Sequence, residues 1–309
     1  MTNETSPQSN QTLAILMILL TGVALAGMDV TAKYLAVHFP VLLVIWGRYF
    51  FHTVLTFAAC TAKSRSLAFL RARRPGLQLI RALALFGTTS CIYVAIQNMP
   101  LGDAAAIQFF APVLVTVISG LFLGEQVGPQ RWTAVMFAFG GVLLIARPGF
   151  DGLGWAALLP FCSAVFLSIY MVLTRLIRDK DNSDTTTFYS TAVGAVALTL
   201  VLPFFWQTPT MEQWALMVLM GSLGATGHFL LIKALHTAEA SLLAPFTYFH
   251  VVAAIFWGFL VFGDIPSVWM LAGTSIIICS GIFVWYRETK IKTKTKTKTK
   301  TKTKKPLSN

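Results

Sequence analysis

Long apolar runs recur along almost the whole chain and leave no room for a separate soluble domain. A helix needs about 20 apolar residues to cross the ~30 Å hydrocarbon core of a bilayer. Polar, proline and glycine residues divide this chain into ten runs of that order. Only 12% of the residues are charged, whereas soluble domains carry about 25%. The sequence therefore predicts an all-α integral membrane protein with ten transmembrane helices. The expected spans are residues 12–34, 41–61, 77–98, 103–123, 130–147, 153–174, 186–206, 213–235, 240–262 and 267–286.

A weak internal repeat relates the two halves of the chain. A shift of 139 positions places residues 77–125 on the second half, with Phe109 on Tyr248. Each half holds five spans, an odd number, so the second copy inserts upside down relative to the first. Inverted repeats place a binding site near the membrane midplane, at the interface between the halves. We predict one five-helix repeat at residues 12–147 and a second at residues 152–286.

Most of the net charge of +12 lies in the C-terminal tail. From Arg287 onward lysine alternates with threonine, and such a low-complexity segment cannot bury apolar surface. We predict a disordered, lysine-rich tail at residues 287–309. The tail holds ten Lys and Arg residues and one Glu, so the rest of the chain keeps a net charge near +3. This distribution argues against a nucleic-acid partner.

Basic residues concentrate in alternate loops, and this asymmetry predicts the orientation of the chain. The loops after the second and sixth spans are rich in Lys and Arg, whereas the opposite loops offer Lys33 and Arg147. Basic loops stay on the cytoplasmic side of a membrane. We therefore expect both termini to be cytoplasmic, including the polar N-terminal segment at residues 1–11. The basic residues of the two loops are Lys63, Arg65, Arg71, Arg73, Arg74, Arg175, Arg178 and Lys180.

Sequence signatures of enzymes and metal sites are missing. The chain has no phosphate-binding P-loop, no HExxH, no GxSxG and no His and carboxylate cluster at metal-ligand spacing. Its four cysteines fall in different apolar runs without CxxC spacing. We expect no metal, no cofactor and no catalytic residue. The expected partners are a small-molecule substrate and the lipid bilayer, and the oligomeric state stays open.

Ionisable residues inside the predicted spans mark candidate functional positions, because a charge at a helix centre costs about 2.5 kcal/mol or more. In the first span Asp29 and Lys33 lie four residues apart on one helix face. Asp29 either forms a local ion pair with Lys33 or binds a substrate or a proton. Arg48, in the second span, either satisfies backbone carbonyls or pairs with Asp29, or it binds a ligand. Since arginine keeps its charge inside proteins, every interpretation requires a polar interior.

The fourth and ninth spans are repeat mates with matching interruptions. Each places a hydrogen-bonding side chain and aromatic residues beside a proline, which interrupts a helix. Broken helices at corresponding positions of two repeats indicate a transport site. His250 lies beside one of them and is either a packing group or part of that site. The candidate ligand-binding residues are Asp29, Trp46, Arg48, Tyr49, His52, Gln108, Phe109, Thr247, Tyr248 and His250, with Pro112 and Pro245 at the interruptions.

These features resemble the drug/metabolite transporter superfamily, and within it the EamA-type permeases. The resemblance covers about residues 12–286. It implies ten helices in two homologous halves and a permease that works by alternating access in a bacterial inner membrane. Asp264 departs from the pattern, in which glutamate is usual at that position. The matching residues are Met28-Asp29, Lys33-Tyr34, Arg48, Pro112, Gly124-Glu125 and Arg147-Pro148-Gly149.

Within that family, the segment from Met28 to His52 looks most like the bacterial riboflavin transporters. The flat ring of riboflavin could stack on aromatic side chains such as Phe109 and Tyr248. Riboflavin uptake is therefore the expected activity. Carriers of S-adenosylmethionine and of amino acids share parts of the pattern and stay as alternatives. A membrane-embedded enzyme is a remote alternative, because the ionisable residues are scattered along the chain.

The loop charges and the even number of spans generate a topology prediction. Reporter fusions after Arg74 and after Asn309 should both report a cytoplasmic location. A fusion after Asp151 should report the opposite side of the membrane. An external reporter after Asn309 would contradict the ten-span topology.

Overall fold

Helices form all the regular structure in the described part of this chain. The computed structural model describes residues 7–64, 66–123, 129–147, 153–177, 180–237 and 240–303. The α-helices are α1 (Pro7–Ala36), α2 (Val41–Ser64), α3 (Pro75–Asn98), α4 (Leu101–Gln108), α5 (Ala111–Leu123), α6 (Pro129–Ala146), α7 (Leu158–Ile177), α8 (Ser183–Val201), α9 (Met211–Thr237), α10 (Ala240–Thr247), α11 (Phe249–Phe262) and α12 (Val268–Thr303). Three short 3-10 helices accompany them at Ala68–Leu70, Gly154–Ala157 and Leu202–Phe204.

Ten of these helical stretches account for the predicted membrane spans. Seven of them are each long and apolar enough to cross a membrane. The other three are shorter apolar helices at Leu101–Val115, Trp132–Ala146 and Val268–Phe283. The prediction of an all-α membrane protein is confirmed, and the seven long and three shorter apolar helices agree with ten spans.

The fourth and ninth spans are each divided into two helices. α4 ends at Gln108 and α5 begins at Ala111, whereas α10 ends at Thr247 and α11 begins at Phe249. Proline has no N–H group to donate to the preceding turn, and Pro112 and Pro245 lie within three residues of the two interruptions. The predicted breaks at matching positions of the repeats are therefore present.

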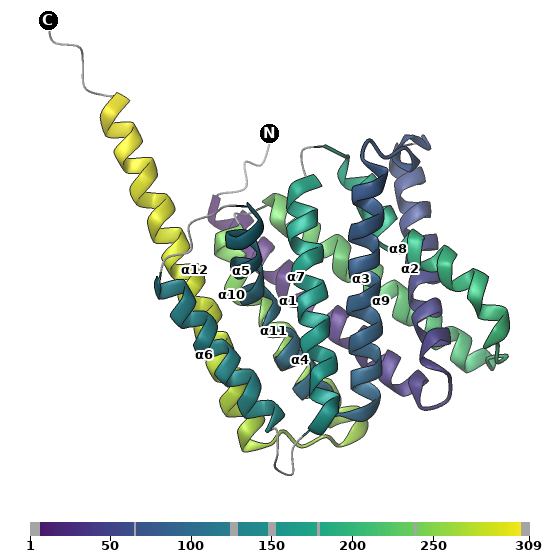
Figure 1. The fold of residues 1–309 in the computed structure, drawn as a ribbon. Helices are drawn as coiled ribbons and strands as arrows, with labels where there is room; N and C mark the ends of the chain where they lie inside the picture. Colours follow the sequence, from purple (N-terminus) through teal and green to yellow (C-terminus); the bar gives the residue numbers. More distant parts are fainter. Residues whose placement is uncertain are drawn as a thin grey trace, which may run out of the picture.

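The two halves interlock along their whole length (Figure 1). The first helix of the first half, α1, packs on the third full-length helix of the second half, α9. Its counterpart α7 packs on α3 in the same way. Helices α2 and α8 also pack together, as do α6 and α12 at one edge of the bundle. Each contact thus has a counterpart in which the halves exchange roles, as expected for inverted repeats.

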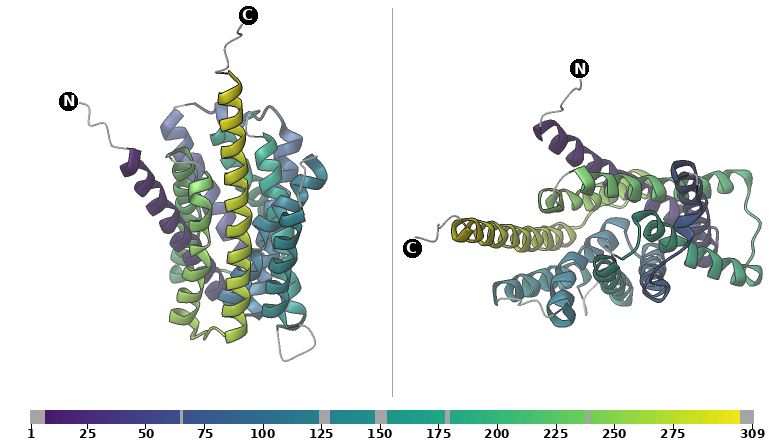
Figure 2. Two further views of the ribbon diagram at one scale, coloured as in Figure 1. Left: turned by 90° about the vertical axis from the view of Figure 1, so that its left-hand side faces the viewer. Right: turned by 90° about the horizontal axis from the view of Figure 1, so that it is seen from above.

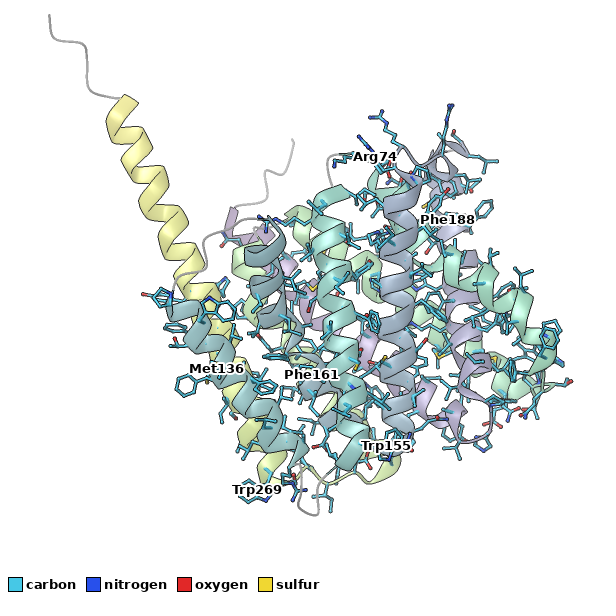
Figure 3. The ribbon with its side chains drawn as sticks, in the orientation of Figure 1. Arg74, Met136, Trp155, Phe161, Phe188 and Trp269 are labelled. Atoms are coloured by element: carbon cyan, nitrogen blue, oxygen red, sulfur yellow. The ribbon has the colours of Figure 1, made fainter. Side chains whose placement is uncertain are left out.

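Polar side chains lie inside the bundle and apolar side chains cover its outside. Gln78, Arg81, Thr89 and Ser163 are all fully buried, whereas large apolar residues such as Met136 are exposed. The side chains of Met136 and Trp269 project outward in Figure 3. Most buried side chains are apolar as well, so the feature that suits a surrounding of lipid is the large number of exposed apolar side chains.

The start of α1 and the end of α12 lie at one end of the bundle (Figures 1 and 2). Arg74, in the basic loop between α2 and α3, lies at that same end (Figure 3). Helix α12 continues beyond the bundle to Thr303. The disorder of residues 287–309 stays a prediction, although the structure draws residues 287–303 as part of this helix. Extending an existing helix needs no new nucleus, and lysine is a good helix former.

Helices α6 and α12 approach closely because each presents a glycine to the other. A Cβ atom on Gly141 would lie 2.8 Å from the carbonyl oxygen of Gly273, and one on Gly273 would lie 2.6 Å from that of Gly141. Glycine permits such close contact between membrane helices. By contrast, a Cβ atom on Gly140, one residue earlier, would meet nothing within 4 Å.

These two neighbouring glycines provide a matched pair for a test of packing. We expect Gly141→Ala to destabilise the protein by about 1–3 kcal/mol, as overpacking does in other tight contacts. Gly140→Ala adds the same methyl group outside the contact and should leave stability unchanged or slightly raised. The measurement is the free energy of unfolding of purified protein in mixed detergent micelles. Equal effects of the two substitutions would contradict the tight contact between α6 and α12.

Candidate functional site

The two helix breaks meet at the interface between the halves. Phe109, in the break between α4 and α5, lies against Tyr248, in the break between α10 and α11, with ring centroids 5.5 Å apart. The hydroxyl of Tyr248 occupies the space beside Gly281 of α12 that a side chain would fill. The residues that the internal repeat paired in sequence are thus also in contact in space.

Asp29 and His250 join the two halves beside this aromatic contact. Oδ2 of Asp29 on α1 lies 3.3 Å from Nε2 of His250 on α11, and both side chains are largely buried. The atoms are at ion-pair distance but are not aligned for a hydrogen bond, since His250 Nε2 has no hydrogen-bond partner. The ring of His250 also lies 5.4 Å from that of Phe109. We call Asp29, Phe109, Tyr248 and His250 the break cluster.

Lys33 does not pair with Asp29, the local ion pair considered from the sequence. Its Nζ atom lies 2.9 Å from Oδ2 of Asp264 in the loop between α11 and α12. It also donates a hydrogen bond to the carbonyl oxygen of Met99. The lysine therefore connects the halves at the end of the bundle opposite to the termini, and Asp29 is left to interact with His250.

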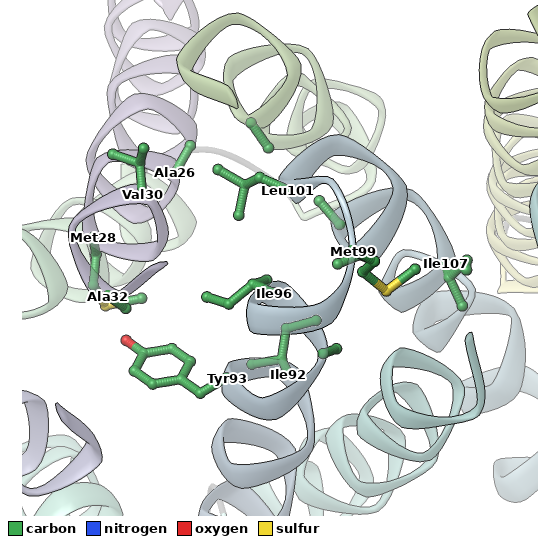
Figure 4. Close-up of a cluster of buried hydrophobic side chains, with 14 of the residues drawn as sticks. Ala26, Met28, Val30, Ala32, Ile92, Tyr93, Ile96, Met99, Leu101 and Ile107 are labelled. Atoms are coloured by element: carbon green, nitrogen blue, oxygen red, sulfur yellow. The ribbon is translucent and has the colours of Figure 1, made fainter. Parts of the chain in front are cut away.

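Arg48 is held by residues of α2 and α3. Its Nη1 atom donates a hydrogen bond of 3.0 Å to Oγ1 of Thr89, which also lies 2.9 Å from the hydroxyl of Tyr49. The guanidinium carbon is 5.3 Å from the ring centre of Tyr93 and 5.8 Å from that of Tyr49. Tyr93 faces Met28 and Ala32 of α1 (Figure 4). We call Arg48, Tyr49, Thr89 and Tyr93 the arginine cluster.

The arginine cluster and the break cluster share one electrostatic environment. The carboxylate of Asp29 acts on both Arg48 and Tyr93. No hydrogen bond or ion pair joins Arg48 to Asp29 in the described residues, so the direct pairing considered from the sequence is not seen. Arg48 and Asp29 are therefore opposite charges that lie near each other in the interior without direct contact.

Gln108 belongs to a hydrogen-bonded chain. Its Nε2 atom donates to Oγ of Ser163 on α7 at 2.7 Å, and that hydroxyl donates to the carbonyl oxygen of Thr88 on α3. These bonds connect the α4–α5 break to a helix of the other half. Thr247 is the last residue of α10, directly before Tyr248.

Trp46 and His52 also belong to α2, but their contacts are with residues outside the two clusters. Trp46 lies in an aromatic group with Trp206 and Trp214 and donates a hydrogen bond to Thr199. The ring of His52 lies 5.3 Å from that of His228 on α9, and its Nδ1 atom has no hydrogen-bond partner. The structure thus places Trp46 outside the two clusters. Among the described residues, no group of three or more His, Cys, Asp or Glu could hold a metal ion.

The sequence interpretation missed Arg81, which organises a polar network across the halves. This fully buried side chain donates hydrogen bonds to Gln78, to Oγ of Ser190 and to the carbonyl oxygen of Thr186. Gln78 in turn donates to Asp181, before α8. Arg81 lies inside the predicted span 77–98, so the criterion that selected Arg48 would also have selected it.

Two polar contacts between the halves therefore enclose the two clusters. The Arg81 network joins α3 to α8 near the end with the basic loops. The Lys33–Asp264 pair joins the halves at the other end. Thr89 and Tyr93 were also missed, because a lone Thr or Tyr in an apolar run gives no sequence signal.

The contact between Asp29 and His250 can be tested with a double-mutant cycle. We expect the effects of Asp29→Asn and His250→Gln on the free energy of unfolding to be non-additive, by about 0.5–3 kcal/mol, as for other contacting residues. The coupling of Asp29→Asn with Lys33→Gln should be smaller, because Lys33 pairs with Asp264. A larger coupling energy between Asp29 and Lys33 than between Asp29 and His250 would instead support the local Asp29–Lys33 pair.

Comparisons with known proteins agree with this architecture. An S-adenosylmethionine uptake transporter of Rickettsia bellii is 29% identical over 88% of this chain and 93% of its own length. A riboflavin transporter of Rhizobium johnstonii is 29% identical over 91% of this chain and 94% of its own length. A solved crystal structure shares the fold with a TM-score of 0.60 and 18% identity, over 89% of this chain and 96% of that one. Residues 12–147 and 154–286 each match the EamA-like transporter family. The match covers most of the chain as two copies of one unit, and the chain therefore belongs to the EamA-like transporter family.

Proposed function

We propose that this transporter carries a small metabolite with a flat heteroaromatic ring and a polar chain across a bacterial inner membrane. The observation that carries the proposal is the meeting of two broken helices, one from each inverted repeat, at Phe109 and Tyr248. At such breaks, ring faces and hydrogen-bonding groups are available near the midplane. A flat ring would stack on Phe109 and Tyr248 while the polar chain contacts the neighbouring charged residues.

The position of two polar contacts between the halves supports transport by alternating access. The Arg81 network and the Lys33–Asp264 pair lie on opposite sides of the two clusters. Rocking of one half against the other would separate one contact while the other stays closed. The substrate site would then open to one side of the membrane at a time. The basic loops support a cytoplasmic location for the Arg81 end and for both termini.

Riboflavin is the first candidate substrate. The resemblance of residues 28–52 to riboflavin transporters supports it, and so does the relative from Rhizobium johnstonii. Its tricyclic ring offers a large stacking surface for Phe109 and Tyr248. S-adenosylmethionine is the second candidate, supported by the relative from Rickettsia bellii. One observation favours it, namely the opposite charges of Asp29 and Arg48 in the interior.

An uptake experiment tests the proposal. We expect cells that can neither make nor otherwise import riboflavin to grow at low riboflavin when they express this protein. Vesicles that contain the purified protein should take up labelled riboflavin or labelled S-adenosylmethionine faster than vesicles without it. If neither compound crosses the membrane and neither binds, the proposed substrate class is wrong.

The aromatic contact generates a second expectation for the same assay. Tyr248→Ala removes a stacking face worth about 0.5–1.5 kcal/mol beyond the buried area, so the apparent affinity should fall several-fold. Gly140→Ala is the control, because the added Cβ atom would meet nothing within 4 Å. If the Tyr248→Ala variant reaches normal membrane abundance and binds with unchanged affinity, the ring of the substrate does not stack on Tyr248.

A further inference from the structure

His52 is a buried histidine whose Nδ1 atom has no hydrogen-bond partner in the described part of the chain. The side chain is 2% exposed. It lies on α2 where two glycines of α9 let the helices approach closely. A Cβ atom on Gly221 would lie 3.0 Å from the backbone nitrogen of His52, and one on Gly224 would lie 3.1 Å from its Nδ1 atom. The Nδ1 atom therefore faces α9, and such a buried nitrogen is costly unless something binds it.

Two further side chains face the same turn of α9. The Cβ atom that Gly224 lacks would also lie 3.1 Å from Sδ of Met28 on α1, whose side chain is 3% exposed. His228 follows Gly224 by four residues, on the same face of α9, and its ring centre lies 5.3 Å from that of His52. Two imidazole rings that bind one metal ion at about 2.0–2.1 Å have their centres about 5–6 Å apart. Met28, His52 and His228 therefore converge from three helices with the spacing of metal ligands.

The chemistry of these donors selects a soft ion of low charge. Imidazole nitrogen and thioether sulfur both bind copper, and a thioether favours Cu⁺ over hard cations such as Mg²⁺ and Ca²⁺. The described residues place no third His, Cys, Asp or Glu with the two histidines, so the four-ligand shell of a structural Zn²⁺ is missing. Arg48 lies one turn before His52 on α2 and repels a divalent ion about twice as strongly as a monovalent one. Cu⁺ accepts low coordination numbers, so two imidazoles and one thioether suffice for it.

We propose that Met28, His52 and His228 bind one soft monovalent metal ion, Cu⁺ or its analogue Ag⁺, and that the bound ion inhibits transport. Met28 and His52 belong to the first half of the chain and His228 to the second, so the ion joins the halves. In the proposed cycle the halves rock against each other, and the ion holds α9 against α1 and α2. The inhibition rests on the proposed transport function, whereas the binding does not. The sequence shows no such site because its ligands come from three separate helices.

Binding is measured with Ag⁺ on the purified full-length protein in detergent and chloride-free buffer. Unbound ions are removed by gel filtration, and the silver that each chain retains is counted over a range of Ag⁺ concentrations. His52→Gln and Met28→Leu each remove one ligand and should each weaken binding at this site about tenfold or more. Two matched controls should leave the binding unchanged. His38→Gln removes an exposed histidine, and Met217→Leu changes a fully buried methionine of α9.

Thiols bind the same ions, so a second protein carries alanine at all four cysteines, Cys60, Cys91, Cys162 and Cys279. This protein should still retain one Ag⁺ per chain and should lose it when His52→Gln is added. If it retains none, or if His52→Gln and Met28→Leu bind as tightly as the unmodified protein, the site is wrong. X-ray absorption of the unmodified protein loaded with Cu⁺ decides the question even if the cysteine-free protein does not fold. Nitrogen and sulfur ligands together support the site, and sulfur ligands alone overturn it.

Uptake into vesicles tests the inhibition and separates it from the proposed function. Ag⁺ that fills the site should stop uptake of labelled riboflavin or S-adenosylmethionine by the unmodified protein. Met28→Leu should need about tenfold more Ag⁺ for the same inhibition, whereas Met217→Leu should need no more than the unmodified protein. If the loaded protein carries its substrate at the full rate, the inhibitory role is wrong. If neither compound is carried, the proposed substrate class fails, and the silver and X-ray absorption measurements still decide the metal site.

Discussion

Backbone groups in a bilayer have no water to bind, and this constraint determines where the chain can be irregular. An unpaired N–H or C=O group in hydrocarbon costs several kcal/mol, so non-helical backbone at membrane depth is tolerated only inside the protein. The breaks at Phe109 and at Tyr248 satisfy this condition, because each lies at the interface between the halves. The two interruptions within spans therefore lie inside the protein, where neighbouring helices cover them. Ring faces and buried charges gather there as a consequence.

Burial of the charged residues follows the same logic. Arg81 is fully buried but surrounded by hydrogen-bond acceptors from Gln78, Thr186 and Ser190. Arg48 is nearly as buried but has a free Nε atom and weaker partners. The two arginines thus differ in how many of their N–H groups have hydrogen-bond acceptors in the protein. The first holds helices of the two halves together, and the second keeps a buried Nε atom without a hydrogen-bond partner.

Much of the fold could be predicted from the sequence, since the length and spacing of apolar runs determine membrane spans almost directly. The breaks were also predictable, because a proline lies within three residues of each of two stretches, Gln108–Phe110 and Thr247–Phe249, that the internal repeat pairs. The partners of the buried charges were not predictable. Asp29 and Lys33 are neighbours on α1, yet they interact with His250 and Asp264, which lie far away in sequence. Such pairings depend on how the halves rotate against each other. A single sequence does not encode that rotation in any local pattern.

The Lys33–Asp264 ion pair also forms hydrogen bonds with backbone groups at two helix ends. Lys33 donates to the carbonyl oxygen of Met99, directly after α3, and Asp264 accepts from the N–H of Leu101, the first residue of α4. A cation thus lies at the C-terminal end of one helix and an anion at the N-terminal end of the next, the arrangement that helix dipoles favour. Because Asp264 belongs to the second half, α4 of the first half is capped by its partner repeat. Separating the halves at this end would therefore uncover two helix termini together with the ion pair.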